Sequence, residues 1–167
     1  MKRLSAPIVF VMLAALPALA GDPAPKERVA PGKGPISISP DEIKWGDAPP
    51  ELPKGAYLAV MRGDPSKKAP FSARLRMPAG YKIPPHWHTN DEQLTIIMGK
   101  FIMHMGDTMD APAHELVAGA FHFLPGKMHH GAQAKEETIV QIDGMGPFDI
   151  HYINPADNPS KSAALTK

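Results

Sequence analysis

The chain has 167 residues, with 18 lysines and arginines against 17 aspartates and glutamates, eight histidines and no cysteine. The balanced charge gives no electrostatic case for binding nucleic acid or an acidic membrane surface. The lack of cysteine excludes disulfides and thiol catalysis, so a metal site would rely on nitrogen and oxygen ligands.

The first twenty residues are typical of a secretory signal peptide. Two positive residues precede an apolar run at 8–15, and the small residues at 18–20 suit a cleavage site. A membrane anchor is the alternative, but it needs roughly 20 apolar residues, and this run is shorter and breaks at Pro17. We therefore expect residues 1–20 to be removed and the mature protein to be periplasmic or secreted, with no membrane attachment.

The next segment is expected to be extended. Residues 21–44 carry proline and glycine at a density that excludes a long helix or a central strand, which predicts a Pro/Gly-rich N-terminal arm. A short helical start is expected at 39–42. The first strand is predicted at 57–61, and the Gly-Asp-Pro sequence at 63–65 ends it as a turn.

From residue 71 onward the pattern consists of short strands separated by turns. Strands are expected at 72–77, 93–98, 101–105, 115–117, 121–124, 138–142 and 150–153. This spacing predicts an antiparallel sandwich or barrel over residues 45–154. Residues 155–167 form a polar C-terminal tail that is expected to fray.

One cluster of residues suggests metal chemistry. His86 and His88 are two positions apart, so on a strand both imidazoles face the same side. Glu92 has the same parity and follows an expected bend, and the two prolines at 84–85 stiffen the approach. A His-x-His pair alone is weak evidence, and the glutamate and a later histidine strengthen it.

Two glycine-bounded motifs complete the pattern. The first consists of Gly80, His86, His88, Glu92 and Gly99, and the second of Gly119, Pro125 and His130. These residues and their spacing resemble the two motifs of the cupin superfamily, specifically its small exported bacterial members with one barrel per chain. The resemblance implies an all-β fold, an antiparallel double-stranded β-helix or jelly-roll barrel. It also implies one divalent metal bound by His86, His88, Glu92 and His130.

The second motif departs from the family pattern at two positions. Lys127 stands where a glycine is usual, and it either adopts that turn or reaches toward the mouth of the barrel. Ala134 replaces the usual terminal asparagine, which affects the local turn rather than the metal site. The doublet at 129–130 is ambiguous, and the family spacing selects His130 and turns His129 away.

The remaining histidines and arginines are interpreted conservatively. His104, His114, His122 and His151 are expected at the surface or as satisfied core residues. Arg74 and Arg76 share one parity of a strand, and their side chains face either solvent or the cavity. The methionines are expected to fill the core rather than to bind copper.

The function stays open between classes. Three imidazoles and one carboxylate suit Fe, Mn, Ni, Cu or Zn and disfavour Ca²⁺ and Mg²⁺. The first hypothesis is a metal-dependent enzyme acting on a small oxygenated molecule, with oxidation by O₂ slightly ahead of lyase or isomerase chemistry, and with no catalytic base assigned. The alternatives are a non-catalytic small-ligand or metal-binding module and a purely structural metal. The family resemblance also suggests a homodimer.

Overall fold

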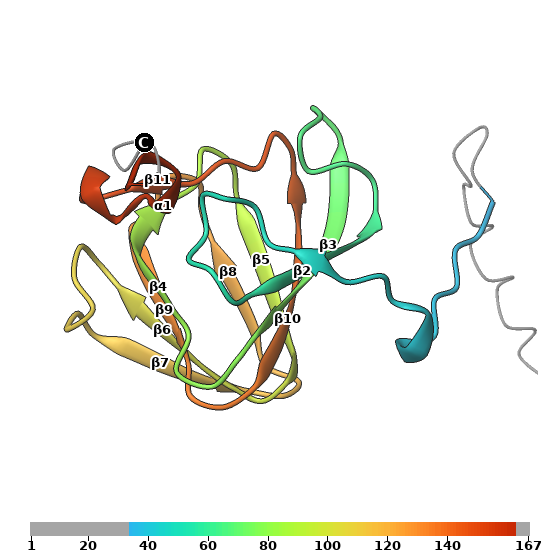
Figure 1. Ribbon diagram of the computed structural model, residues 1–167, viewed down its shortest axis with the longest axis horizontal. Helices are drawn as coiled ribbons and strands as arrows, with labels where there is room; N and C mark the ends of the chain where they lie inside the picture. Colours follow the sequence, from blue (N-terminus) through green and yellow to red (C-terminus); the bar gives the residue numbers. More distant parts are fainter. Residues whose placement is uncertain (1–33, 163–167) are drawn as a thin grey trace, which may run out of the picture. The chain divides into compact units, whose positions relative to one another are not determined.

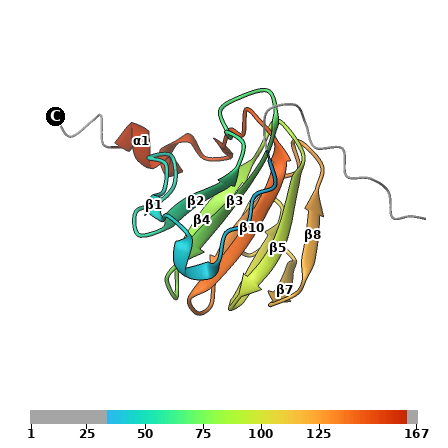
Figure 2. The same ribbon diagram turned by 90° about the vertical axis from the view of Figure 1, so that its right-hand side faces the viewer.

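The computed structural model describes residues 34–162, in which two antiparallel sheets face each other (Figure 1). The six-stranded sheet has the order β1-β2-β3-β10-β5-β8, and the five-stranded sheet has the order β11-β4-β9-β6-β7. Figure 2 shows β2, β3, β10, β5 and β8 side by side. The expected double-stranded β-helix is therefore present, with one barrel in the described chain.

Each of the eight predicted strands overlaps a strand of the structure, which has β1, β4 and β9 in addition. The six-stranded sheet comprises β1 (Gly46–Asp47), β2 (Tyr57–Arg62), β3 (Pro70–Met77), β5 (Glu92–Met98), β8 (Phe121–Leu124) and β10 (Thr138–Met145). The five-stranded sheet comprises β4 (Lys82–Trp87), β6 (Lys100–Met105), β7 (Ala113–Val117), β9 (His130–Ala134) and β11 (His151–Tyr152). The chain from Ile38 onward forms one compact unit, and residues 34–37 contain no helix or strand.

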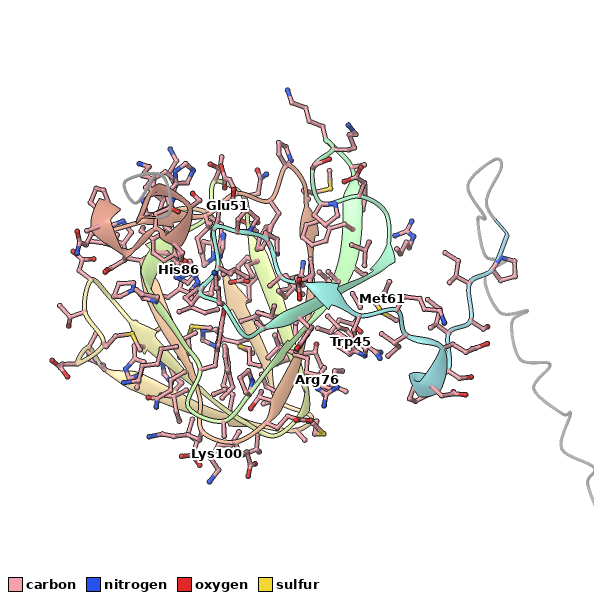
Figure 3. All side chains as sticks on the ribbon, in the orientation of Figure 1. Trp45, Glu51, Met61, Arg76, His86 and Lys100 are labelled. Atoms are coloured by element: carbon pink, nitrogen blue, oxygen red, sulfur yellow. The ribbon has the colours of Figure 1, made fainter. Side chains whose placement is uncertain are left out.

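Alternating burial along β3 explains how the core forms. Ala73, Leu75 and Met77 are buried between the sheets, because successive side chains of a strand point to opposite faces. Arg74 and Arg76 therefore lie on the outer face, where they bond to Gln141 and Glu137. Arg76 points away from the barrel in Figure 3. Of the two orientations that the sequence allows for Arg74 and Arg76, solvent or cavity, the structure therefore shows the solvent side.

The ends of the described chain contain short helical turns. A 3-10 helix, η1 (Pro40–Glu42), begins at Ser39 with a capping box, as the sequence predicts. Past residue 154 the expected fraying tail instead begins with η2 (Pro155–Asp157) and α1 (Pro159–Ser162). The side chain of Asn154 starts η2 by accepting a hydrogen bond from the backbone of Ala156. No helix within residues 34–162 has the length and apolar character needed to cross a membrane.

Lys127 adopts the turn that a glycine usually makes. Its φ is +66°, in the left-handed region, and it is the only non-glycine with positive φ among the described residues. Its backbone N–H donates to the carbonyl of His88 over 2.7 Å, which ties the β8–β9 turn to the end of β4. The lysine therefore preserves the backbone geometry of the second motif.

Candidate metal centre

Three histidines converge between the two sheets. His86 lies on β4 (labelled in Figure 3), His88 follows the end of that strand, and His130 begins β9. One ring nitrogen from each lies within 4.8 Å of the others, and all three side chains are buried. His86 and His130 meet because β4 and β9 are neighbours and these two residues are register partners.

Each of these imidazoles is held through Nδ1. The Nδ1 of His86 bonds to the carbonyl of Pro84 over 2.7 Å, and the Nδ1 of His130 bonds to the carbonyl of Met128 over 2.9 Å. The Nδ1 of His88 bonds to the carbonyl of Asp149 over 2.5 Å. A carbonyl only accepts hydrogen bonds, so Nδ1 must carry the proton and Nε2 keeps a free lone pair. All three rings are thus prepared as neutral ligands.

Glu92 approaches the same point from the opposite sheet. It begins β5, and its Oε2 lies 3.7 Å from Nε2 of His88 and 3.5 Å from Nε2 of His130. This oxygen is buried and has no hydrogen-bond partner among the described residues. Burial raises the pKa of Glu92 to about 7. A buried carboxylate oxygen without a partner is costly, and a cation would satisfy it.

The histidines favour the neutral state. Burial lowers the pKa of all three, and for His86 the neighbouring rings of His130 and His88 lower it further. Neutral imidazoles do not repel a metal cation as imidazolium ions do, and their Nε2 lone pairs are free to bind it. Three neutral nitrogens and one carboxylate therefore fit a divalent transition ion.

A small cavity of about 60 Å³ adjoins these four residues. Apart from the four, its walls are apolar: Leu52, Leu75, Ile83, Leu94, Phe101, Met103, Ala132, Val140, Ile142, Phe148 and Ile150. Such a volume has room for a few water molecules, since roughly 10–15 Å³ of this kind of volume holds one. Among residues 34–162, no acid or base other than the four lines it.

Two larger hollows lie elsewhere on the described surface. One of about 510 Å³ is lined by Arg62, Asp91 and Asp143, on the outer side of the loop that joins His88 to Glu92. The other, of about 490 Å³, lies along the proline-rich segment at 47–56. Neither hollow is lined by His86, His88 or His130. Although both are larger than the cavity beside the histidines, neither is part of the candidate metal centre.

The structure brings His86, His88 and His130 together, with Glu92 close to the last two, and none of the other histidines belongs to this cluster. His129 faces outward, where its Nδ1 bonds to Asp107 over 2.6 Å. His151 stacks on Trp87 and bonds to Asp149, and His114 is exposed. Two histidines differ from the expected satisfied state, because both ring nitrogens of His104 and Nε2 of His122 are buried without a partner in the part of the chain described.

Sequence reasoning missed the contribution of the segment after β10. The ring of Phe148 stacks on His88 with centroids 4.3 Å apart, and Phe148 and Ile150 line the cavity. The carbonyl of Asp149 is the partner of His88. No periodicity or motif near these residues indicates that they return to the site, since only the path of the chain from β10 to β11 takes them there.

Comparisons with known proteins agree with this architecture. A family described as "Domain of unknown function (DUF4437)" matches residues 36–151. No curated protein matches the sequence.

Several solved structures share the fold at low identity. The polyketide cyclase RemF from Streptomyces resistomycificus has a TM-score of 0.64 and 12% identity, with 78% of this chain and 94% of that one covered. A candidate acetylacetone dioxygenase from Methylibium petroleiphilum PM1 has a TM-score of 0.59 and 15% identity, with 83% and 99% covered. An RmlC-like cupin from Shewanella frigidimarina NCIMB 400 has a TM-score of 0.52 and 15% identity, with 66% and 91% covered. At these identities the likeness concerns the cupin fold alone.

Proposed function

The chain belongs to the DUF4437 family of cupin-like proteins, and from that premise we propose that His86, His88, Glu92 and His130 bind one divalent transition metal. One observation carries this proposal. Three unprotonated Nε2 atoms and the unpartnered Oε2 of Glu92 converge in a buried space. Without a cation, this arrangement would leave a buried acceptor unsatisfied beside three lone pairs.

The ligand set favours a divalent transition ion such as Fe, Mn, Ni, Co, Cu or Zn. When bound, such an ion polarises an oxygen of the substrate, or supports oxidation by O₂ if it is redox-active. Glu92 supplies one negative charge and the histidines supply none, so the four residues leave a divalent ion with a net positive charge. A substrate oxygen with anionic character would therefore be favoured.

We propose that the substrate is a small oxygenated molecule with an apolar body. The apolar lining residues suit such a body, and the four candidate ligands suit its oxygen. The cavity of about 60 Å³ would have to widen to admit it, since organic ligands occupy pockets of roughly 300–1,000 Å³. Oxidation by O₂ ranks ahead of lyase or isomerase chemistry, because those reactions need a positioned acid or base. Among the lining residues, only the four candidate ligands could move a proton.

The chain's own residues orient the rings of the site. The backbone carbonyls of Pro84 and Met128 fix the two rings of His86 and His130. Phe148 covers one face of His88.

Elemental analysis tests the proposal. The mature protein is purified from its native compartment without a chelator, alongside His88→Ala. Near-stoichiometric iron, manganese, nickel, copper or zinc that is lost in the variant would support the site. No metal in either protein would contradict it. Turnover assays with diketones and small carboxylates, for each metal-loaded form, then test the enzymatic part of the proposal.

The small volume of the cavity favours a second candidate function, a non-catalytic metal-binding module. A cavity of about 60 Å³ admits water or a diatomic ligand more readily than an organic substrate. Water-proton relaxation of the manganese- or copper-loaded protein distinguishes the two. A site without exchangeable water would indicate a purely structural metal and contradict both candidates. Fast exchange together with turnover would support the enzyme, and fast exchange without turnover would support the binding module.

Export and self-association remain proposals. Residues 1–20, the predicted signal peptide, lie outside the described residues, and N-terminal sequencing of the exported protein tests cleavage after residue 20. We also propose a homodimer on the family resemblance. Light scattering of the mature chain tests it, and a purely monomeric mass would contradict it.

A further inference from the structure

Of the three histidines of the site, His88 is the one whose Nδ1 bonds to a residue far away in the sequence. The Nδ1 of His86 and that of His130 each bond to a carbonyl two residues earlier in the chain. The Nδ1 of His88 instead bonds to the carbonyl of Asp149, which is 61 positions away. β4 ends at Trp87, so His88 also lies beyond the last strand residue.

The side chain of Asp149 ties this distant carbonyl to the residue next to His88. Its Oδ1 accepts from the backbone N–H of Thr89 over 2.8 Å, and its Oδ2 accepts from the Thr89 hydroxyl over 2.6 Å. His151 bonds to Oδ2 over 2.9 Å. The His151 ring stacks on Trp87 at 4.0 Å, and these two residues are register partners of β11 and β4.

These contacts close a loop around one imidazole. His88 is covalently joined to Thr89, and Thr89 donates two hydrogen bonds to the Asp149 carboxylate. The backbone carbonyl of Asp149 in turn accepts from Nδ1 of His88, which completes the loop. Phe148 fixes the remaining freedom by stacking on the ring with planes 19° apart. A fixed Nδ1–H bond determines both the tautomer and the direction of Nε2.

We infer that Asp149 is a positioning residue that holds His88 in the Nδ1–H tautomer with Nε2 aimed at His130 and Glu92. The proposal that His88 is a metal ligand rests on the proposed function, but the tautomer and the ring orientation do not. The carboxylate acts through Thr89 and the backbone, and it does not itself line the cavity.

The test is ¹⁵N NMR of histidine-labelled, metal-free protein at a pH where the imidazoles are neutral. The wild type should show His88 only as the Nδ1–H tautomer. Asp149→Ala should add signals of the Nε2–H tautomer, which is the usual preference of a free imidazole in water. Thr89→Val keeps the backbone N–H bond and should give a smaller change in the same direction, which covers the case in which Asp149→Ala does not fold.

The matched control is Asp143→Ala. The Asp143 carboxylate also has two side-chain partners, Ser72 and Gln141, but it makes no hydrogen bond to any of the four candidate ligands. It should leave the His88 signals unchanged even if it lowers the melting temperature. A purely Nδ1–H His88 in folded Asp149→Ala or Thr89→Val, or an equal change in Asp143→Ala, would overturn the inference.

A second readout uses the metal-loaded protein. Asp149→Ala should bind Co²⁺ about 10- to 100-fold more weakly in competition with a chelator, the usual cost of losing an outer hydrogen bond to a ligand. A changed tautomer in a protein that binds no metal would support the positioning role and contradict the proposed function. Wild-type affinity in Asp149→Ala, with Co²⁺ lost from His86→Ala, would contradict the positioning role alone.

Discussion

His86 and His130 are direct cross-strand partners on β4 and β9, and their ring centroids lie 4.2 Å apart. This pairing depends on register, because a slip of one residue turns every side chain of a strand to the opposite face. Such a slip would bring His129 inward and send His130 to the surface. The register of two backbone strands therefore decides which member of the histidine doublet joins the site.

The doublet gives the most direct prediction. His130→Ala and His86→Ala should each lower metal affinity by more than the 10- to 100-fold typical of an outer-shell change, because each removes a ligand. His129→Ala should leave affinity nearly unchanged, since that ring faces Asp107 outside the barrel. Competition with a chromophoric chelator measures all three. Equal losses at 129 and 130 would contradict the observed register.

Glu92 should make the metal-free protein less stable at high pH. Its pKa rises from 4.5 to about 7 on folding, so the folded protein binds a proton that the unfolded chain releases between these values. The contribution to stability is complete below pH 4.5 and is lost as the pH rises through 7. At about 1.4 kcal/mol per pKa unit, the ionised carboxyl costs about 3 kcal/mol at pH 8.

Glu92→Gln removes this dependence. In the metal-free state the variant should be more stable than the wild type at pH 8 and similar to it near pH 4.5, as measured by urea unfolding. The lowered pKa values of the three histidines act in both proteins and largely cancel in the difference. A difference that does not change between pH 4.5 and 8 would show that Glu92 is not buried as an ionisable group.

The two glycines of the first motif should differ in their tolerance of alanine. Gly80 and Gly99 both have positive φ, +80° and +84°, but a Cβ on Gly80 would meet nothing within 4 Å. A Cβ on Gly99 would lie 2.3 Å from the carbonyl oxygen of Glu137, where backbone must move. Gly80→Ala should cost roughly 1–2 kcal/mol from φ alone. Gly99→Ala should cost roughly 1–3 kcal/mol more from the clash, and thermal unfolding at equal pH compares them.

Lys127 offers a stabilising change. A left-handed backbone costs an L residue roughly 1–2 kcal/mol. Glycine avoids this cost, but its more flexible unfolded chain loses roughly 0.5–1 kcal/mol more conformational entropy on folding. Lys127→Gly should therefore raise the free energy of unfolding by about 0.5–1 kcal/mol and keep the N–H bond to His88. Lys127→Ala is the control, because it removes the charge and keeps the strain. A similar gain in both variants would assign the effect to the charge.

Much of this architecture can be predicted from the sequence, because it depends on local periodicity. The alternation of Ala73, Leu75 and Met77 with Arg74 and Arg76 fixes a strand with one buried face. Turn residues separate such strands, so a β-sandwich or barrel follows from spacing alone. The motif spacing also selected His86, His88, Glu92 and His130, which the structure places together. Among the described residues, three strands have no counterpart in that pattern: the two-residue β1, and β4 and β9, which carry the motif histidines.

Tertiary structure alone decided how the site is assembled. Equal parity brought His86 and His88 together, but Glu92 reaches them from the opposite sheet, and only sheet packing sets that distance. Phe148 and Asp149 hold His88 although no local pattern relates them to it. Periodicity records which face a side chain takes on its own element. It carries no information about which distant carbonyl, ring or carboxylate the fold places against that face, because such contacts depend on chain path and register over the whole barrel.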